Sequence, residues 1–129
     1  MNLNYKQVEL QKLISLPELK QSDFGWFENG PTPMIIVLAA NAKDRDRLVK
    51  YFSKIEGINN KLKFVLHPED AVGLNAFAIY KSYNVDKDSE IFKFCVNRVV
   101  SRCSGRTVGG IYELFYPVWV VFGDKIEED

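Results

Sequence analysis

The chain has 129 residues, of which 47% are hydrophobic and 26% are charged, a balance typical of one globular domain. Lysine plus arginine and aspartate plus glutamate each total 17, so the basic excess of a usual nucleic-acid binder is missing. No apolar stretch approaches the ~18 residues that a transmembrane helix needs, and no signal-peptide pattern follows Met1. We therefore expect a cytoplasmic protein with no membrane or nucleic-acid partner, and a net charge of zero permits a homodimer.

Residues 1–32 predict an N-terminal helix followed by an aromatic connection. The helix is expected over 3–16, where leucines and an isoleucine recur on one stripe. The connection is rich in glycine and proline and carries Phe24, Trp26 and Phe27. We expect these rings to pack onto the core, and the alternative is that they form a contact surface.

Residues 33–40 are the longest unbroken apolar run and predict a strand buried on both faces. Asn41 is a good helix N-cap, and Asp44 stands at the third helical position, where an acidic side chain completes a capping arrangement. The pattern then predicts a helix to about residue 56. Its core face is expected to consist of Leu48, Val49, Phe52 and Ile55.

Two further strands are predicted over residues 61–67 and 74–83. The first alternates apolar and polar residues, and its Lys61 and Lys63 suit the edge of a sheet. The second is more continuously apolar. A polar, turn-like segment precedes each of them.

A second strong helix is predicted over residues 89–103, with half of its surface apolar. Residues 111–122 then predict strand structure, either one strand or two divided at Pro117. Residues 124–129 form an acidic tail, which we expect to be frayed.

The predicted element order after residue 32 is β-α-β-β-α-β, within a single α+β domain over residues 1–129. This is the order of the ferredoxin-like split βαβ motif, which has a single antiparallel or mixed sheet. Its first and third strands would be central, its second and fourth strands would be edges, and the added N-terminal helix would cover the open face. A different mixed α+β sheet is the alternative.

No motif commits the chain to catalysis, a cofactor or a metal. His67 is the only histidine and could act as a general base beside neighbouring carboxylates, but nothing supplies a paired nucleophile. Cys95 and Cys103 lie two turns apart on one helix, which is too far for a disulfide and too few ligands for a metal site. We therefore expect no catalytic residues, no cofactor and no metal.

Two further interpretations, phosphate binding and RNA binding, have little support in the sequence. Residues 104–110 could cradle an anion with backbone amides and Arg106, but they lack P-loop spacing and follow a helix instead of opening one. Residues 74–83 lack the alternating aromatics with which an RNA-recognition motif stacks bases. A plain connecting loop and no RNA partner are therefore favoured.

A protein-binding surface is the best-supported interpretation. Phe94 falls among polar residues of the 89–103 helix, with Arg98 and Arg102 on the same side. A solvated aromatic beside arginines is typical of contact surfaces, and the alternative, with equal support, is a local cation–π contact between Phe94 and Arg98. Glu69, Asp70 and the acidic tail could mimic nucleic acid toward a basic nuclease toxin.

We therefore predict a small non-catalytic protein-binding module, for example a bacterial toxin-neutralising immunity protein or a similar inhibitor, with another protein as its partner. The predicted partner-binding residues are Phe94, Arg98, Arg102, Glu69 and Asp70. One alternative is a small-ligand-binding regulatory domain that uses a sheet face or the loop 104–110. Another is an enzyme centred on His67.

Overall fold

The computed structural model describes residues 4–24, 32–103, 114–115 and 117–127. Its strands are β1 (Tyr5–Gln7), β2 (Met34–Leu38), β3 (Lys61–Val65), β4 (Ala76–Lys81) and β5 (Val118–Phe122). Its described α-helices include α1 (Leu10–Ile14), α2 (Ala42–Ser53) and α3 (Glu90–Cys103). A 3-10 turn, η1 (Gln21–Phe24), lies between α1 and β2, and a second, η2 (Pro68–Ala71), lies between β3 and β4. Within these described residues, no helix is long and apolar enough to cross a membrane.

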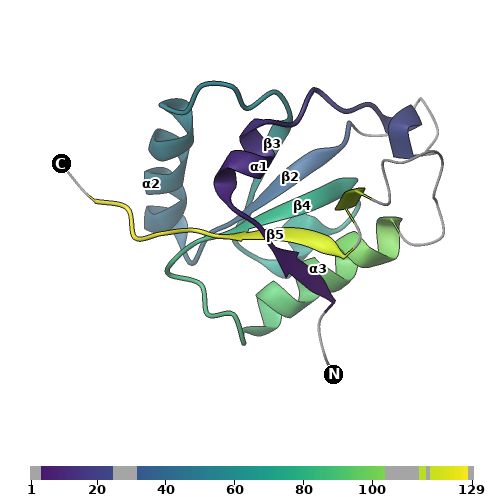
Figure 1. Ribbon diagram of the computed structural model, residues 1–129. Helices are drawn as coiled ribbons and strands as arrows, with labels where there is room; N and C mark the ends of the chain where they lie inside the picture. Colours follow the sequence, from purple (N-terminus) through teal and green to yellow (C-terminus); the bar gives the residue numbers. More distant parts are fainter. Residues whose placement is uncertain (1–3, 25–31, 104–113, 116, 128–129) are drawn as a thin grey trace.

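The five strands form one all-parallel sheet in the order β1-β5-β4-β2-β3 (Figure 1). The predicted ferredoxin-like fold with an antiparallel or mixed sheet is therefore wrong. The prediction treated β3 and β4 as sheet strands without a crossover helix between them. They are instead the two neighbours of β2, and η2 crosses between them over one face of the sheet, with Ala71 buried in the core there.

The two ends of the predicted order also differ from the structure. The fourth predicted strand is β5, which lies between β4 and β1 and is not an edge. Pro117 comes just before β5 and leaves the strand's own hydrogen bonds intact. The predicted helix over residues 3–16 is a strand and a short helix, and β1 adds to the sheet beside β5.

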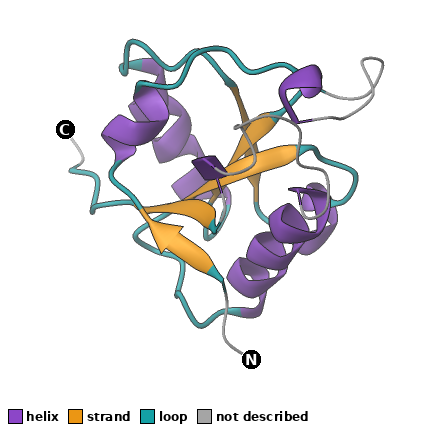
Figure 2. Cartoon of the chain, turned by 45° about the vertical axis from the view of Figure 1, so that its right-hand side comes forward, coloured by secondary structure: helices purple, strands orange, loops and turns teal. Residues whose placement is uncertain are grey.

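The sheet separates two layers of helices (Figures 1 and 2). Alternate residues of β2 point to opposite faces, as the strand's period of two requires. Ile35 and Val37 share a core cluster with Leu48 of α2, whereas Ile36 and Leu38 share another with α3. β2 is apolar throughout, as expected of a strand that is covered on both faces. Burial of each of its large apolar side chains stabilises the folded state by roughly 1.5–3 kcal/mol.

The predicted core face of α2 is confirmed at Leu48 and Phe52 only, since Ile55 follows the end of the helix, and the apolar half of α3 is buried or half-buried where its side chains are described. Leu48 and Phe52 of α2 are buried, and in α3 the side chains of Phe92, Cys95, Val96 and Val99 are buried. Val49 is an exception, because its side chain is 45% exposed. It follows Leu48 by one position, about 100° around the helix, and so faces away from the sheet.

Candidate functional site

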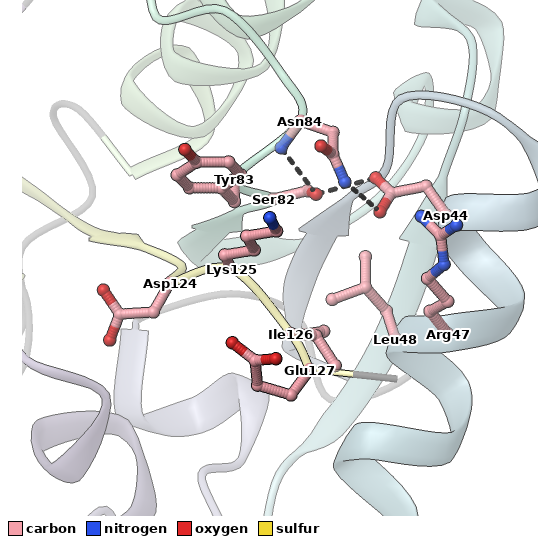
Figure 3. Close-up of a pocket in the computed structure, with 10 residues that line it drawn as sticks. All are labelled: Asp44, Arg47, Leu48, Ser82, Tyr83, Asn84, Asp124, Lys125, Ile126 and Glu127. Atoms are coloured by element: carbon pink, nitrogen blue, oxygen red, sulfur yellow. Dashed lines mark hydrogen bonds between the residues drawn. The ribbon is translucent and has the colours of Figure 1, made fainter. Parts of the chain in front are cut away.

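All five strands end at the same edge of the sheet, because they are parallel. At this carboxyl edge, the chain leaves β2 toward β3 on one side and leaves β4 toward β5 on the other. Open α/β sheets bind ligands in the crevice outside such a reversal point. A cavity of about 250 Å³ lies at this place (Figure 3) and is lined by Asp44, Arg47, Leu48, Ser82, Tyr83, Asn84, Asp124, Lys125, Ile126 and Glu127.

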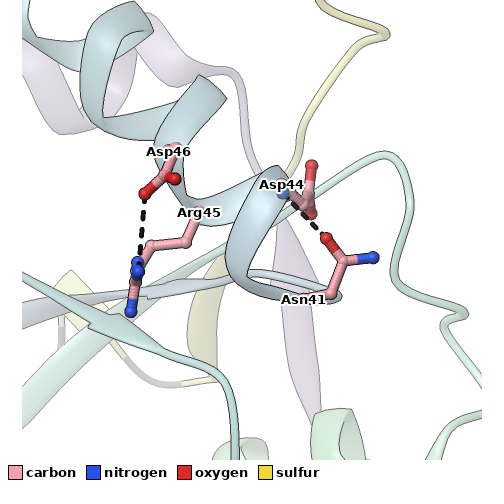
Figure 4. A network of polar contacts seen from close by, with 4 residues as sticks. All are labelled: Asn41, Asp44, Arg45 and Asp46. Carbon is pink, nitrogen blue, oxygen red and sulfur yellow. Dashed lines mark hydrogen bonds and ion pairs between the residues drawn. The ribbon is translucent and has the colours of Figure 1, made fainter.

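One wall of the cavity is built around Asp44 in the first turn of α2. Asn41 caps this helix, its Oδ1 accepting the Asp44 backbone N–H at 2.8 Å (Figure 4). The Asp44 carboxylate accepts the Ala40 N–H at 2.8 Å and the Ser82 hydroxyl at 2.7 Å on Oδ2, and the Asn84 amide at 3.0 Å on Oδ1. Asp44 therefore joins the ends of β2 and β4 across the reversal point.

The environment of Asp44 keeps its carboxylate charged. Burial acts to raise its pKa, but the hydrogen bonds from Ala40, Ser82 and Asn84, together with the positive charge of Arg47, outweigh burial, so the pKa lies below its usual value. With three donors already bound, this carboxylate occupies the positive end of α2. It is suited to holding the wall in place, and its low pKa makes it a poor general base at neutral pH.

The opposite wall is the segment 124–127, which follows β5. The Gly123 N–H donates to the Lys81 carbonyl at 2.7 Å and continues the pairing of β5 with β4 for one more residue. Beyond it, Ile126 packs against the core cluster on the α2 side. Lys125 points toward the loop after β4 in Figure 3. The cavity thus has an ordered polar wall on one side and a largely charged segment on the other.

Lys81 supports the loop after β4 from the other face of the sheet. It is only 6% exposed, and its ammonium donates to the carbonyls of Ser82, at 2.9 Å, and Val85. It also lies 5.3 Å from the centre of the Phe122 ring, which provides a cation–π contact. Burial lowers its pKa, and the nearby Asp86 acts in the opposite direction. Lys81 does not line the cavity but positions the loop that does.

The partner-binding residues predicted on α3 lie away from this cavity. Phe94 is 37% exposed and belongs to neither core cluster. Arg98 is half-buried, and its Nε has no hydrogen-bond partner among the described residues. The side chain of Arg102 and the loop 104–110 lie outside the described residues.

The residues predicted around η2 are also absent from the cavity lining. Glu69 is exposed, and Asp70 accepts the backbone N–H groups of Leu66, at 3.2 Å, and His67, at 3.1 Å. These hydrogen bonds hold the pKa of Asp70 below its usual value. Asp70 therefore has a structural task at the end of β3, and the exposed His67 is not part of the cavity wall.

The cavity was not predicted from the sequence, although the sequence contains a signal for it. Ser82, Asn84 and Asp124 are polar residues that come directly after apolar strands. Polar groups in these positions converge only when the strands are parallel. In the predicted ferredoxin-like sheet the strands over 33–40 and 74–83 would be antiparallel, so Asp44 would lie at the opposite edge from Ser82 and Asn84.

The described residues provide no group of three or more histidine, cysteine, aspartate or glutamate side chains arranged to hold a metal ion. Cys95 is a buried free thiol whose pKa is raised by burial to about 12, so it is not an activated nucleophile. Comparison with known proteins identifies no family to which the chain belongs: no family model, no curated protein and no solved structure matches it.

Proposed function

We propose that the protein binds a small polar molecule in the cavity at the carboxyl edge of its sheet. The observation that carries this proposal is the place of the cavity, outside the point where the chain reverses between β2 and β4. A volume of about 250 Å³ suits a metabolite smaller than a typical drug molecule.

The chemistry of the walls supports binding of a polar ligand. Two cationic residues, Arg47 and Lys125, and two exposed acidic residues, Asp124 and Glu127, border the cavity. Leu48, Tyr83 and Ile126 add apolar surface to this lining. Since the Asp44 carboxylate is occupied by three donors, the arrangement offers recognition groups but no obvious proton shuttle. Binding is therefore favoured over catalysis.

The proposal is tested by recording ¹H–¹⁵N NMR spectra during titration with four probes of different charge: malate, glutamate, 1,4-diaminobutane and glycerol. At least one probe is expected to shift the amide resonances of Ser82, Asn84 and Lys125 in a saturable way. The same probe should raise the melting temperature, because it binds only the folded state.

A pair of charge reversals supplies the control for this titration. Lys125→Glu lies in the cavity wall, whereas Lys63→Glu changes an exposed lysine on the edge strand β3. For an anionic probe, the first variant should weaken binding by roughly tenfold or more and the second by little. Failure of every probe to shift the cavity resonances would count against a small-ligand site.

A second proposed function is binding of another protein through α3, as in a toxin-neutralising inhibitor. The observation that favours it is Phe94, whose aromatic side chain is 37% exposed and packs in neither core cluster. Exposed aromatic residues often anchor protein interfaces. Arg98, one helical turn further on, would supply an adjacent polar contact.

Phe94→Asp distinguishes this second function from the first. The substitution is expected to lower the free energy of unfolding by no more than about 1 kcal/mol, as for a surface position, while abolishing association with a protein partner. Affinity purification from the native host, followed by reconstitution with the purified partner, measures the association, and chemical denaturation measures stability. A loss of several kcal/mol would show instead that Phe94 is a core residue.

A further inference from the structure

We propose that residues 124–127, here called the strap, move away from α2 to admit the ligand and then close over it. Packing of the Ile126 side chain against the core, here called the latch, would hold the strap in its closed position. This inference rests on the proposed small-ligand function but concerns how the site opens. The strap provides Asp124, Lys125, Ile126 and Glu127, a substantial part of the cavity wall. Its movement would therefore change the size of the site directly.

The hydrogen bonding of the strap differs sharply from that of the strand before it. β5 is paired along both sides, with β4 and with β1. The pairing ends where the Gly123 N–H donates to the Lys81 carbonyl. Residues 124–127 form no hydrogen bond or ion pair with other described residues. Gly123 is thus the last residue held by the sheet, and the loosely held segment begins directly after it.

Side-chain packing leaves Ile126 as the main attachment of the strap. Asp124, Lys125 and Glu127 are exposed, whereas Ile126 is half-buried and packs against the core cluster that contains Leu48. Ile126 and Leu48 both line the cavity (Figure 3). Detaching one half-buried isoleucine costs much less than breaking paired strands, so the strap can open while the sheet remains intact.

The opposite wall cannot respond in the same way. Asp44, Ser82 and Asn84 are joined by hydrogen bonds of 2.7 and 3.0 Å, and Lys81 holds the same loop from the other face. Opening on that side would expose a buried carboxylate and several backbone donors. The site therefore has one fixed wall and one movable wall, which is the arrangement that admits and then encloses a ligand.

Methyl relaxation-dispersion NMR on the full chain without any ligand tests the strap directly. The methyl groups of Ile126 and Leu48 are expected to show microsecond-to-millisecond exchange, because their surroundings change each time the strap opens and closes. The methyl of Ile79, buried in β4 on the α3 side, should show none. Flat dispersion profiles for both Ile126 and Leu48 would overturn the proposal.

Two latch variants make the test quantitative. Ile126→Val and Ile126→Ala should raise the open population stepwise, by roughly tenfold for the alanine variant, because each removes part of the packed side chain. The Leu48 methyl resonances should move along one line from wild type through the valine to the alanine variant. Val49→Ala, at an exposed position of α2, is the matched control and should leave the Leu48 exchange unchanged.

The outcomes separate the strap from the ligand site. If the titration identifies a ligand but Ile126 and Leu48 show no exchange, the site is real and its wall is rigid, so the strap proposal fails alone. If the exchange is present but equally strong at Ile79, the motion belongs to the whole fold, and the strap proposal again fails. If both substitutions leave the Leu48 resonances in place, Ile126 is not the latch.

Discussion

Asp44→Ala should lower the free energy of unfolding by roughly 3 kcal/mol, because it removes a buried charged acceptor and leaves its donors without a partner. This carboxylate accepts hydrogen bonds from the Ala40 N–H, the Ser82 hydroxyl and the Asn84 amide. Asp44 as a whole is only 2% exposed. A loss of this size is a large fraction of the ~5–15 kcal/mol that stabilises a typical domain. Urea denaturation monitored by circular dichroism measures it.

Asp46→Ala provides the matched control on the same helix. Asp46 forms an ion pair with Arg45 at 3.4 Å, but its side chain is 71% exposed (Figure 4). Such surface pairs contribute only about 0–1 kcal/mol, so the control should be nearly as stable as wild type. Equal losses for the two variants would contradict the view that Asp44 joins β2 to β4.

The same carboxylate makes stability depend on acid pH. The pKa of Asp44 is lower in the folded protein than in the unfolded chain, where an aspartate has a pKa of about 3.9. Below about pH 4 the unfolded state therefore binds more protons, and stability falls as the pH decreases through the folded pKa. Asp44→Asn should make this acid loss shallower without abolishing it, since the pKa of Asp70 is also lowered.

Gly123→Ala is expected to destabilise the protein by about 2–3 kcal/mol through overpacking. A Cβ atom at this position would lie 2.3 Å from the Tyr80 hydroxyl oxygen and 2.5 Å from the carbon that bears it. The Tyr80 ring cannot easily retreat, because it is 2% exposed and packs edge-to-face on Phe52 at 4.9 Å. Thermal and urea unfolding measure the loss.

A double-mutant cycle identifies Tyr80 as the cause of that loss. Tyr80→Leu removes the ring, so adding Gly123→Ala to this variant should cost much less than it does in wild type. Gly73→Ala is the comparison: a Cβ there meets no atom within 4 Å, and its cost of about 1 kcal/mol would come from a positive φ of 83°. An equal cost of Gly123→Ala with and without Tyr80 would refute the steric explanation.

Local sequence patterns were sufficient to predict several elements. The continuous apolar run predicted β2, and the helical periodicity predicted α2 and α3 within a few residues of their observed bounds. Asn41 caps α2 as predicted, and Asp44 bonds to the backbone of Ala40, one residue before the cap. These features depend on residues within one or two turns of each other, so the sequence alone contains the necessary information.

Strand direction and order required the tertiary structure. The sequence of residues 61–83 does not show that β3 and β4 lie on opposite sides of β2. A short crossover connection and a hairpin connection can have similar amino-acid composition, although they produce different strand directions. β1 shows the same limit. Its three residues carry little strand pattern, and they form a strand because β5 offers an edge, where the Val8 N–H also reaches the Val120 carbonyl at 2.9 Å.

Local patterns in the sequence are thus enough to locate the apolar segments, the helices and the start of α2. The meeting of the ends of β2, β4 and β5 at one edge, which brings Asp44, Ser82 and Asn84 opposite the strap, depends on the folded sheet. The difference lies in the sequence separation over which each interaction acts. Periodicity and capping act between near neighbours, whereas this cavity depends on contacts between residues about forty positions apart, whose partners are set by how the whole sheet packs.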